Sequence, residues 1–193
     1  MERMQVYIMS VKFEKIKMLE MEESIKTFFE ENNIERTIPV DIFAVASSLG
    51  FDIRGAEFKE PLEGLLLVDE NVARIKEFNS NKIIAYNCQK SIYMKKFIVA
   101  HELSHYISEK SKNKDKKIVL AARDHEGEYS NNTVEQEMDY MAASILMPRE
   151  DLLENFGGKN TERTELINLI ASRYNVSVKM AERRIEEVLN GWW

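Results

Sequence analysis

The sequence has little of what marks secreted, membrane-spanning or cysteine-rich proteins. Among its 193 residues there is 1 Cys, which excludes an internal disulfide and a four-cysteine zinc site. With only 3 Pro and 7 Gly, long unstructured linkers are not expected. No apolar run approaches the roughly 18 residues of a transmembrane helix. The apolar stretch at the N-terminus is too short and too interrupted by charge for a secretory signal, so we expect a cytoplasmic protein.

Charge of one sign does not dominate the chain either. There are 27 basic and 33 acidic residues, a formal net charge of −6, which does not favour broad electrostatic attachment to nucleic acid. Hydrophobic residues make up 44% and charged residues 31%, a balance typical of one globular domain. Histidine is scarce, with 3 in the chain, so the positions of these residues are informative.

The spacing of apolar residues predicts an α+β fold. Helical periodicity marks six segments: 18–32, 37–50, 91–109, 133–147, 165–174 and 177–189. Strand-like alternation or short apolar runs mark four others: 51–56, 64–68, 82–86 and 117–122. Polar breaks separate the strands, and the simplest arrangement is a small, largely antiparallel sheet. We expect the fourth helix to end at Pro148, because the residue before a proline disfavours the α region.

One motif within the predicted 91–109 helix carries chemistry. The run His101-Glu102-Leu103-Ser104-His105 matches H-E-x-x-H, which places both histidines on one helix face within reach of one metal ion. Glu102 lies beside them, directed toward the place of a metal-bound water. The alternative is an exposed helix with two ordinary histidines and a salt-bridging glutamate. A chance match is rare with so few histidines, so we favour the metal site.

Catalytic zinc sites usually have three protein ligands, so a third ligand must come from elsewhere. A histidine six residues after the second one is absent, because that position is Ser111. The 133–147 helix offers Glu135 as a ligand, with Asp139 on the same face to support a ligand histidine. Glu137 competes with Glu135 but lies on the opposite side of that helix. The apolar stripe of the helix favours Glu135.

Four further residues have less certain roles at this level. His125, between the two motifs, is a candidate stabiliser of an oxyanion, a substitute ligand, or an ordinary loop histidine. Tyr106 and Tyr140 are candidate oxyanion donors, although packing is the commoner role for tyrosines beside such helices. Cys88 is expected to be a buried, small apolar residue.

Two segments resemble the ImmA/IrrE-type metallopeptidases. They are FIVAHELSHYI, residues 97–107, and EQEMDYMAASILMP, residues 135–148, and the resemblance extends over about residues 35–190. It implies a zincin-like fold, with the sheet packed on the motif helix and on an acidic ligand helix. It also implies zinc ligands His101, His105 and Glu135, and Glu102 as catalytic acid and base. The sequence departs from the family pattern at three positions, namely Ser104, Met138 and Met141.

The resemblance also implies an organisation and a function. We expect an N-terminal helical extension (1–33), a zincin-like metallopeptidase domain (34–158) and a C-terminal helical pair packed on it (159–193). One Zn²⁺ per chain would serve hydrolysis of peptide bonds. Apart from the resemblance, pairing by backbone hydrogen bonds leads us to expect an extended substrate along the strand edge near 82–87. The expected substrate is a helix-turn-helix transcriptional repressor.

Two other functions remain open. The first is a non-proteolytic regulator that binds a repressor or DNA and uses zinc structurally. The second is a general peptidase or a toxin–antitoxin-like module. The C-terminal pair has a helix-turn-helix outline with Arg183 and Arg184 on its second helix. Because acidic residues balance basic ones there, direct nucleic-acid binding is not expected.

Overall fold

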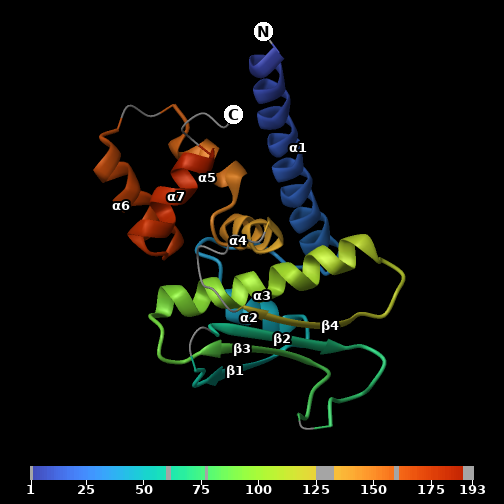
Figure 1. Ribbon diagram of the computed structural model, residues 1–193. Coiled ribbons are helices and arrows are strands. Elements are labelled where there is room, and N and C mark those ends of the chain that lie inside the picture. The colour runs from blue at the N-terminus through green and yellow to red at the C-terminus, as the bar shows by residue number, and fades with distance from the viewer. Residues whose placement is uncertain (1, 60–61, 77, 125–132, 159–160, 189–193) are drawn as a thin grey trace.

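The computed structural model describes residues 2–59, 62–76, 78–124, 133–158 and 161–188 (Figure 1). Seven helices lie in these ranges: α1 (Glu2–Glu31), α2 (Ile42–Ser48), α3 (Ile92–Lys112), α4 (Thr133–Leu146), α5 (Arg149–Phe156), α6 (Arg163–Tyr174) and α7 (Val178–Val188). Four strands accompany them: β1 (Asp52–Ala56), β2 (Gly64–Asp69), β3 (Lys82–Asn87) and β4 (Val119–Asp124). The expected α+β class is therefore confirmed. No helix in the described part of the chain is long and apolar enough to cross a bilayer.

The four strands form one sheet in the order β1-β3-β2-β4. β2 runs antiparallel to both β3 and β4, whereas β1 runs parallel to β3. Along β2 the alternate residues Gly64, Leu66 and Val68 are buried. This period-2 pattern is what a strand with one covered face requires.

Helix α3 lies across the sheet and separates it from α4, while α2 contacts both α3 and β1 (Figure 1). Ser91 caps its N-terminus by accepting a hydrogen bond from the backbone N–H of Met94 at 3.3 Å. α4 packs on the side of α3 away from the sheet, α1 contacts both α3 and α4, and the α5–α7 group lies further from the sheet (Figure 1). One apolar core runs through all of these layers, and it includes Ile25, Ile84, Ile107, Ile145 and Ile185. The division into three parts remains a prediction.

The far end of α3 is held to the sheet by Glu70. The Glu70 carboxylate accepts hydrogen bonds from the Tyr106 hydroxyl at 2.8 Å, from Lys110 Nζ at 2.8 Å and from the Ile118 N–H at 2.9 Å. Burial by itself would raise the pKa of Glu70, but these three donors outweigh it and lower the pKa to about 2. The group fixes how α3 lies on the sheet, and with it the direction of the motif face.

The structure differs from the predictions in three places: the start of α1, the presence of α5 and the place of β3 in the sheet. α1 begins at Glu2, although periodicity predicted a start at residue 18. α5 was not predicted, because Pro148 was interpreted only as a helix stop. Pro148 in fact occupies the N-cap of α5, where the helix needs no hydrogen bond from its backbone nitrogen, so the missing N–H is not unfavourable. The expected peptide-binding edge at 82–87 is β3, which is paired on both sides. Short apolar runs do not reveal the order of strands in a sheet.

A buried arginine connects α7 to α1 and α4. Arg184 is 0% exposed, and it donates hydrogen bonds to Glu22 Oε1 at 2.9 Å and to the Met147 carbonyl at 3.1 Å. Its guanidinium also lies over the Tyr140 ring, 5.1 Å from the centroid, and the Tyr140 hydroxyl donates to Glu22 at 2.7 Å. The second arginine of the helix-turn-helix outline therefore points into the protein.

We expect Arg184→Met to lower the free energy of unfolding by about 3 kcal/mol, because the Glu22 carboxylate loses its cation in a largely buried place. The double variant with Glu22→Gln should recover part of this loss, since it removes the uncompensated charge. Urea unfolding measures both. The control is Arg163→Met, which removes an exposed pair with Glu186 and should leave the midpoint nearly unchanged. Equal midpoints for wild type and Arg184→Met would contradict this account.

Candidate metal centre

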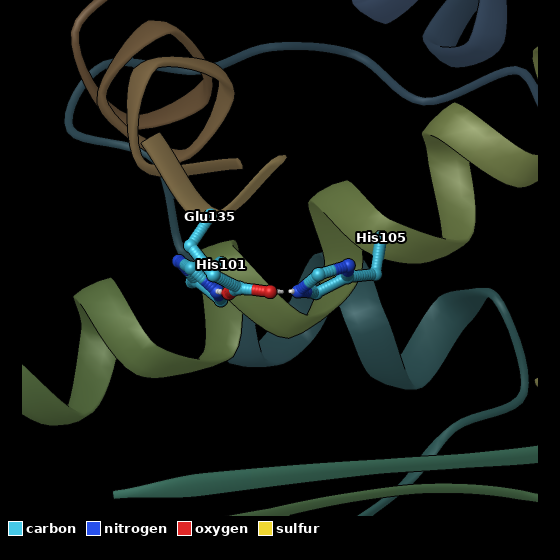
Figure 2. A group of neighbouring side chains, drawn as sticks. All are labelled: His101, His105 and Glu135. Atoms are coloured by element: carbon cyan, nitrogen blue, oxygen red, sulfur yellow. Dashed lines mark hydrogen bonds and ion pairs between the residues drawn. The ribbon is translucent and has the colours of Figure 1, made fainter. Parts of the chain in front are cut away.

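Three side chains from α3 and α4 meet above the sheet. His101 and His105 lie one turn apart on α3, and Glu135 lies in the first turn of α4 (Figure 2). His101 Nε2 lies 3.0 Å from Glu135 Oε2 and 3.2 Å from His105 Nε2. His105 Nε2 lies 3.5 Å from the same carboxylate oxygen. Among the described residues, these three form the only group of histidine, cysteine or acidic side chains arranged to hold a metal ion.

The three separations match the edges of a metal-ligand tetrahedron. Zinc with tetrahedral bonds of 2.0–2.1 Å separates its ligand atoms by about 3.3 Å. The observed ligand-atom separations of 3.0, 3.2 and 3.5 Å lie close to that value. Two imidazoles and one carboxylate are also a donor set that zinc takes in catalytic sites, where the fourth position stays open. The residues therefore fit a divalent metal of this kind.

The charges around His101 favour a cation at the same place. Its other ring nitrogen, Nδ1, lies 3.0 Å from Asp139 Oδ1, and the His101 side chain is only 4% exposed. Burial by itself would lower the pKa of His101, but Asp139, Glu135 and Glu102 together raise it to about 10. Hydrogen bonds from His101 and His105 hold the pKa of Glu135 well below its usual range. A metal ion would supply the positive charge that a proton otherwise brings.

Asp139 orients the imidazole of His101. By accepting a hydrogen bond from Nδ1–H, a carboxylate leaves the lone pair of Nε2 directed at the metal position. The second oxygen of Asp139, Oδ2, lies 3.6 Å from Arg183 Nη1 on α7. The C-terminal helical pair thus contacts the carboxylate that supports a candidate ligand. Arg183 was named from the sequence as part of a helix-turn-helix outline without an expected role in DNA binding, and the structure places it beside this carboxylate.

Glu102 is fully buried between α3 and the start of β2. Its side chain is 0% exposed, and a Cβ on Gly64 would overlap Glu102 Oε1 and lie 2.7 Å from Ile98 Cγ2. Only glycine at this strand position leaves room for the carboxyl group against the sheet. Sequence reasoning missed Gly64, although a glycine inside a strand signals a close approach of this kind.

The remaining candidates from the sequence lie elsewhere. Glu137 is directed to α1, where it pairs with Lys17 at 2.5 Å. Tyr106 and Tyr140 direct their hydroxyls to Glu70 and Glu22, so they serve the two networks described above. His125 lies outside the described residues. Cys88 is partly exposed, so the expectation that it is buried was wrong.

Fold and site together define an α+β protein with a candidate metal centre. Residues 49–186 match the Peptidase_M78 family, described as the IrrE N-terminal-like domain. Because the match covers more than half of the chain, the protein belongs to this family, as the resemblance of its two motifs implied. Membership indicates a metallopeptidase with a protein substrate. No curated protein matches the sequence.

We expect Gly64→Ala to lower the free energy of unfolding by about 2 kcal/mol, because the new methyl group displaces Glu102 or pushes α3 off the sheet. Gly55→Ala is the matched control, since it also adds a methyl group to a strand. A Cβ there meets nothing nearer than Tyr86 Oη at 3.3 Å. Chemical denaturation compares the two, and equal losses would contradict the close approach at Gly64.

Proposed function

We propose that this protein is a zinc-dependent peptidase that binds one Zn²⁺ through His101, His105 and Glu135. The observation that carries the proposal is the triangle of three donor atoms, with separations of 3.0 to 3.5 Å, beside a buried glutamate. Family membership supports peptide bonds as the substrate class. Asp139 holds His101 in the tautomer that leaves Nε2 free for the metal.

Glu102 is the residue that moves protons in this proposal. Zinc, when bound, supplies Lewis acidity that brings the pKa of a coordinated water near neutrality. The Glu102 carboxylate accepts the proton of the attacking water and then donates it to the leaving amine of the peptide. Burial against Gly64 keeps this carboxylate away from bulk solvent and in a fixed direction. Its place next to the first histidine of the motif supports the role.

The edge strand β4 offers a place for an extended substrate. Among the described residues β4 pairs only with β2, and it forms one edge of the sheet. Its last residue, Asp124, pairs with Gly64, which lies against Glu102. A peptide that adds to this edge by backbone hydrogen bonds would pass close to the proposed acid and base.

The resemblance to ImmA/IrrE-type proteins leads us to propose a regulatory substrate, a helix-turn-helix repressor. The direction of Arg184 supports a protein partner over DNA for the C-terminal pair. Arg184 is buried, and Arg183 is bonded to Glu187 at 3.1 Å, so neither is presented as a free cation to a phosphate backbone.

Measurements of zinc affinity test whether Glu135 or Glu137 is the third ligand. We expect Glu135→Ala to weaken zinc affinity by at least about 100-fold, because loss of a direct ligand exceeds the effect of losing an outer partner. Glu137→Ala removes a carboxylate two residues away and should retain one zinc per chain. Competitive titration with a zinc-binding dye and elemental analysis measure both. Zinc loss in Glu137→Ala with retention in Glu135→Ala would reverse the assignment.

Peptide hydrolysis tests the role of Glu102. We expect Glu102→Gln to keep its zinc but to lower kcat/KM by about 10³-fold, because proton transfer to and from the reacting groups is lost. Glu109→Gln, the same substitution two turns further along α3, should keep wild-type activity. Cleavage of an unfolded protein and of a candidate repressor provides the measurement. A Glu102→Gln variant with full biological effect would instead favour the non-proteolytic regulator with structural zinc.

A further inference from the structure

A hollow lies away from the candidate metal centre, between α1, the 34–38 segment and the start of α5. Its volume is about 450 Å³, which is within the range of small-molecule sites. Apolar side chains line part of it: Ile25, Phe29, Ile34 and Ile38. Ser144, near the C-terminal end of α4, lines it together with residues of α1 and α5.

One wall of this hollow carries a buried hydroxyl. Ser144 is 3% exposed, and its Oγ has no hydrogen-bond partner among the residues that the structure describes. Most serines within helices bond to the carbonyl one turn back, as Ser104 does on α3. A buried hydroxyl without a partner is unfavourable, and a polar ligand in the hollow would satisfy it.

Two other parts of the same wall offer favourable contacts for a negative charge. Arg36 stacks on Phe29, 4.8 Å from the ring centroid, and makes no salt bridge within the described part of the chain. Desolvation lowers the pKa of Arg36 more than Glu150 and Glu22 raise it, so its charge is only partly compensated. The N-terminus of α5 also borders the hollow, and no side chain caps it, while Glu150 and Asp151 lie in its first turn. Uncapped helix N-termini attract anions.

Six carboxylates also line the hollow: Glu22, Glu23, Glu30, Glu150, Asp151 and Glu154. Of the carboxylates that line it, Glu22 and Asp151 already bond to Arg184 and Arg173. The exposed side chains of Glu150 and Glu154 lie one turn apart on α5 and make no salt bridge among the residues described. A ligand that satisfies both Arg36 and these two carboxylates has an anionic group and a cationic group.

We propose that this hollow binds the carboxylate of a zwitterionic amino acid or of a peptide C-terminus. The carboxylate contacts Arg36, Ser144 Oγ and the N-terminus of α5, and a basic group faces Glu150 and Glu154. Ser144 lies nine positions after Glu135 on α4, about 13.5 Å along the helix axis, so the site is distinct from the candidate metal centre. The proposal does not depend on peptidase activity.

Binding of four probes to the metal-free protein tests the proposal, with calorimetry as the measurement. L-arginine carries both charged ends, whereas agmatine is the same molecule without the carboxylate. A short peptide that ends in arginine is used with a free and with an amidated C-terminus. We expect L-arginine or the free-acid peptide to bind, and the agmatine and the amidated peptide to bind at least about tenfold more weakly. Preference for the peptide over the amino acid identifies a chain terminus as the source of the carboxylate.

Variants locate the binding. Arg36→Gln should weaken it by at least about tenfold, because a charge-assisted hydrogen bond is lost. The matched control is Arg54→Gln on β1. This substitution removes a guanidinium that stacks on Phe78, 5.2 Å from the ring centroid. Ser144→Ala should also weaken binding, while its midpoint of thermal unfolding stays unchanged or rises, since a buried hydroxyl without a partner is removed.

Three results would overturn the proposal. The first is equal binding of arginine and agmatine, or binding of either only above about 10 mM, which is too weak for a formed site. The second is wild-type affinity in Arg36→Gln and Ser144→Ala. The third is an equal loss in Arg54→Gln, which would indicate non-specific attraction. Because the readout is binding, a failure here is distinct from a failure of Glu102→Gln to lose peptidase activity.

Discussion

The placement of His101 in the contact between α3 and α4 is the constraint on which the rest of the site depends. A buried imidazole must use both of its nitrogens, and here Nδ1 meets Asp139 while Nε2 meets Glu135. Both acids lie on α4, four residues apart and therefore on one face of that helix. This face supplies a hydrogen-bond partner to each of the two ring nitrogens of His101. His105 then completes the group because it lies one turn further along α3. Any shift between these two helices would separate all four.

The surrounding parts of the chain hold this contact in place. Glu70 secures the far end of α3 to the sheet, and Gly64 lets the other part of the helix lie close to β2. On the opposite side, Arg184 joins α7 to Glu22 of α1 across α4. Buried ion pairs of this kind contribute little net stability but are costly to break, so they specify one arrangement of the helices. The N-terminal and C-terminal helices thereby help to support the candidate metal centre.

Part of this site could be predicted from the amino-acid sequence, and part of it could not. The four-residue spacing of the two histidines depends only on helix geometry, so it needed no tertiary information. Glu135 was favoured over Glu137 from the apolar stripe of α4, and the structure directs Glu137 to Lys17 instead. In contrast, β3 was expected at an edge and lies inside the sheet. Strand order depends on long-range pairing, which a short apolar run does not encode.

The sequence by itself determined most of the helices, the mixed fold class and the placement of two histidines on one helix face, because these follow from local periodicity and residue type. Only the tertiary structure decided that a glycine of β2 makes room for Glu102, that Arg184 points inward, and that Ser144 borders a hollow. The physical reason is that each of these depends on two segments distant in the chain coming within a few ångströms. Contacts of that kind are set by packing of the whole core.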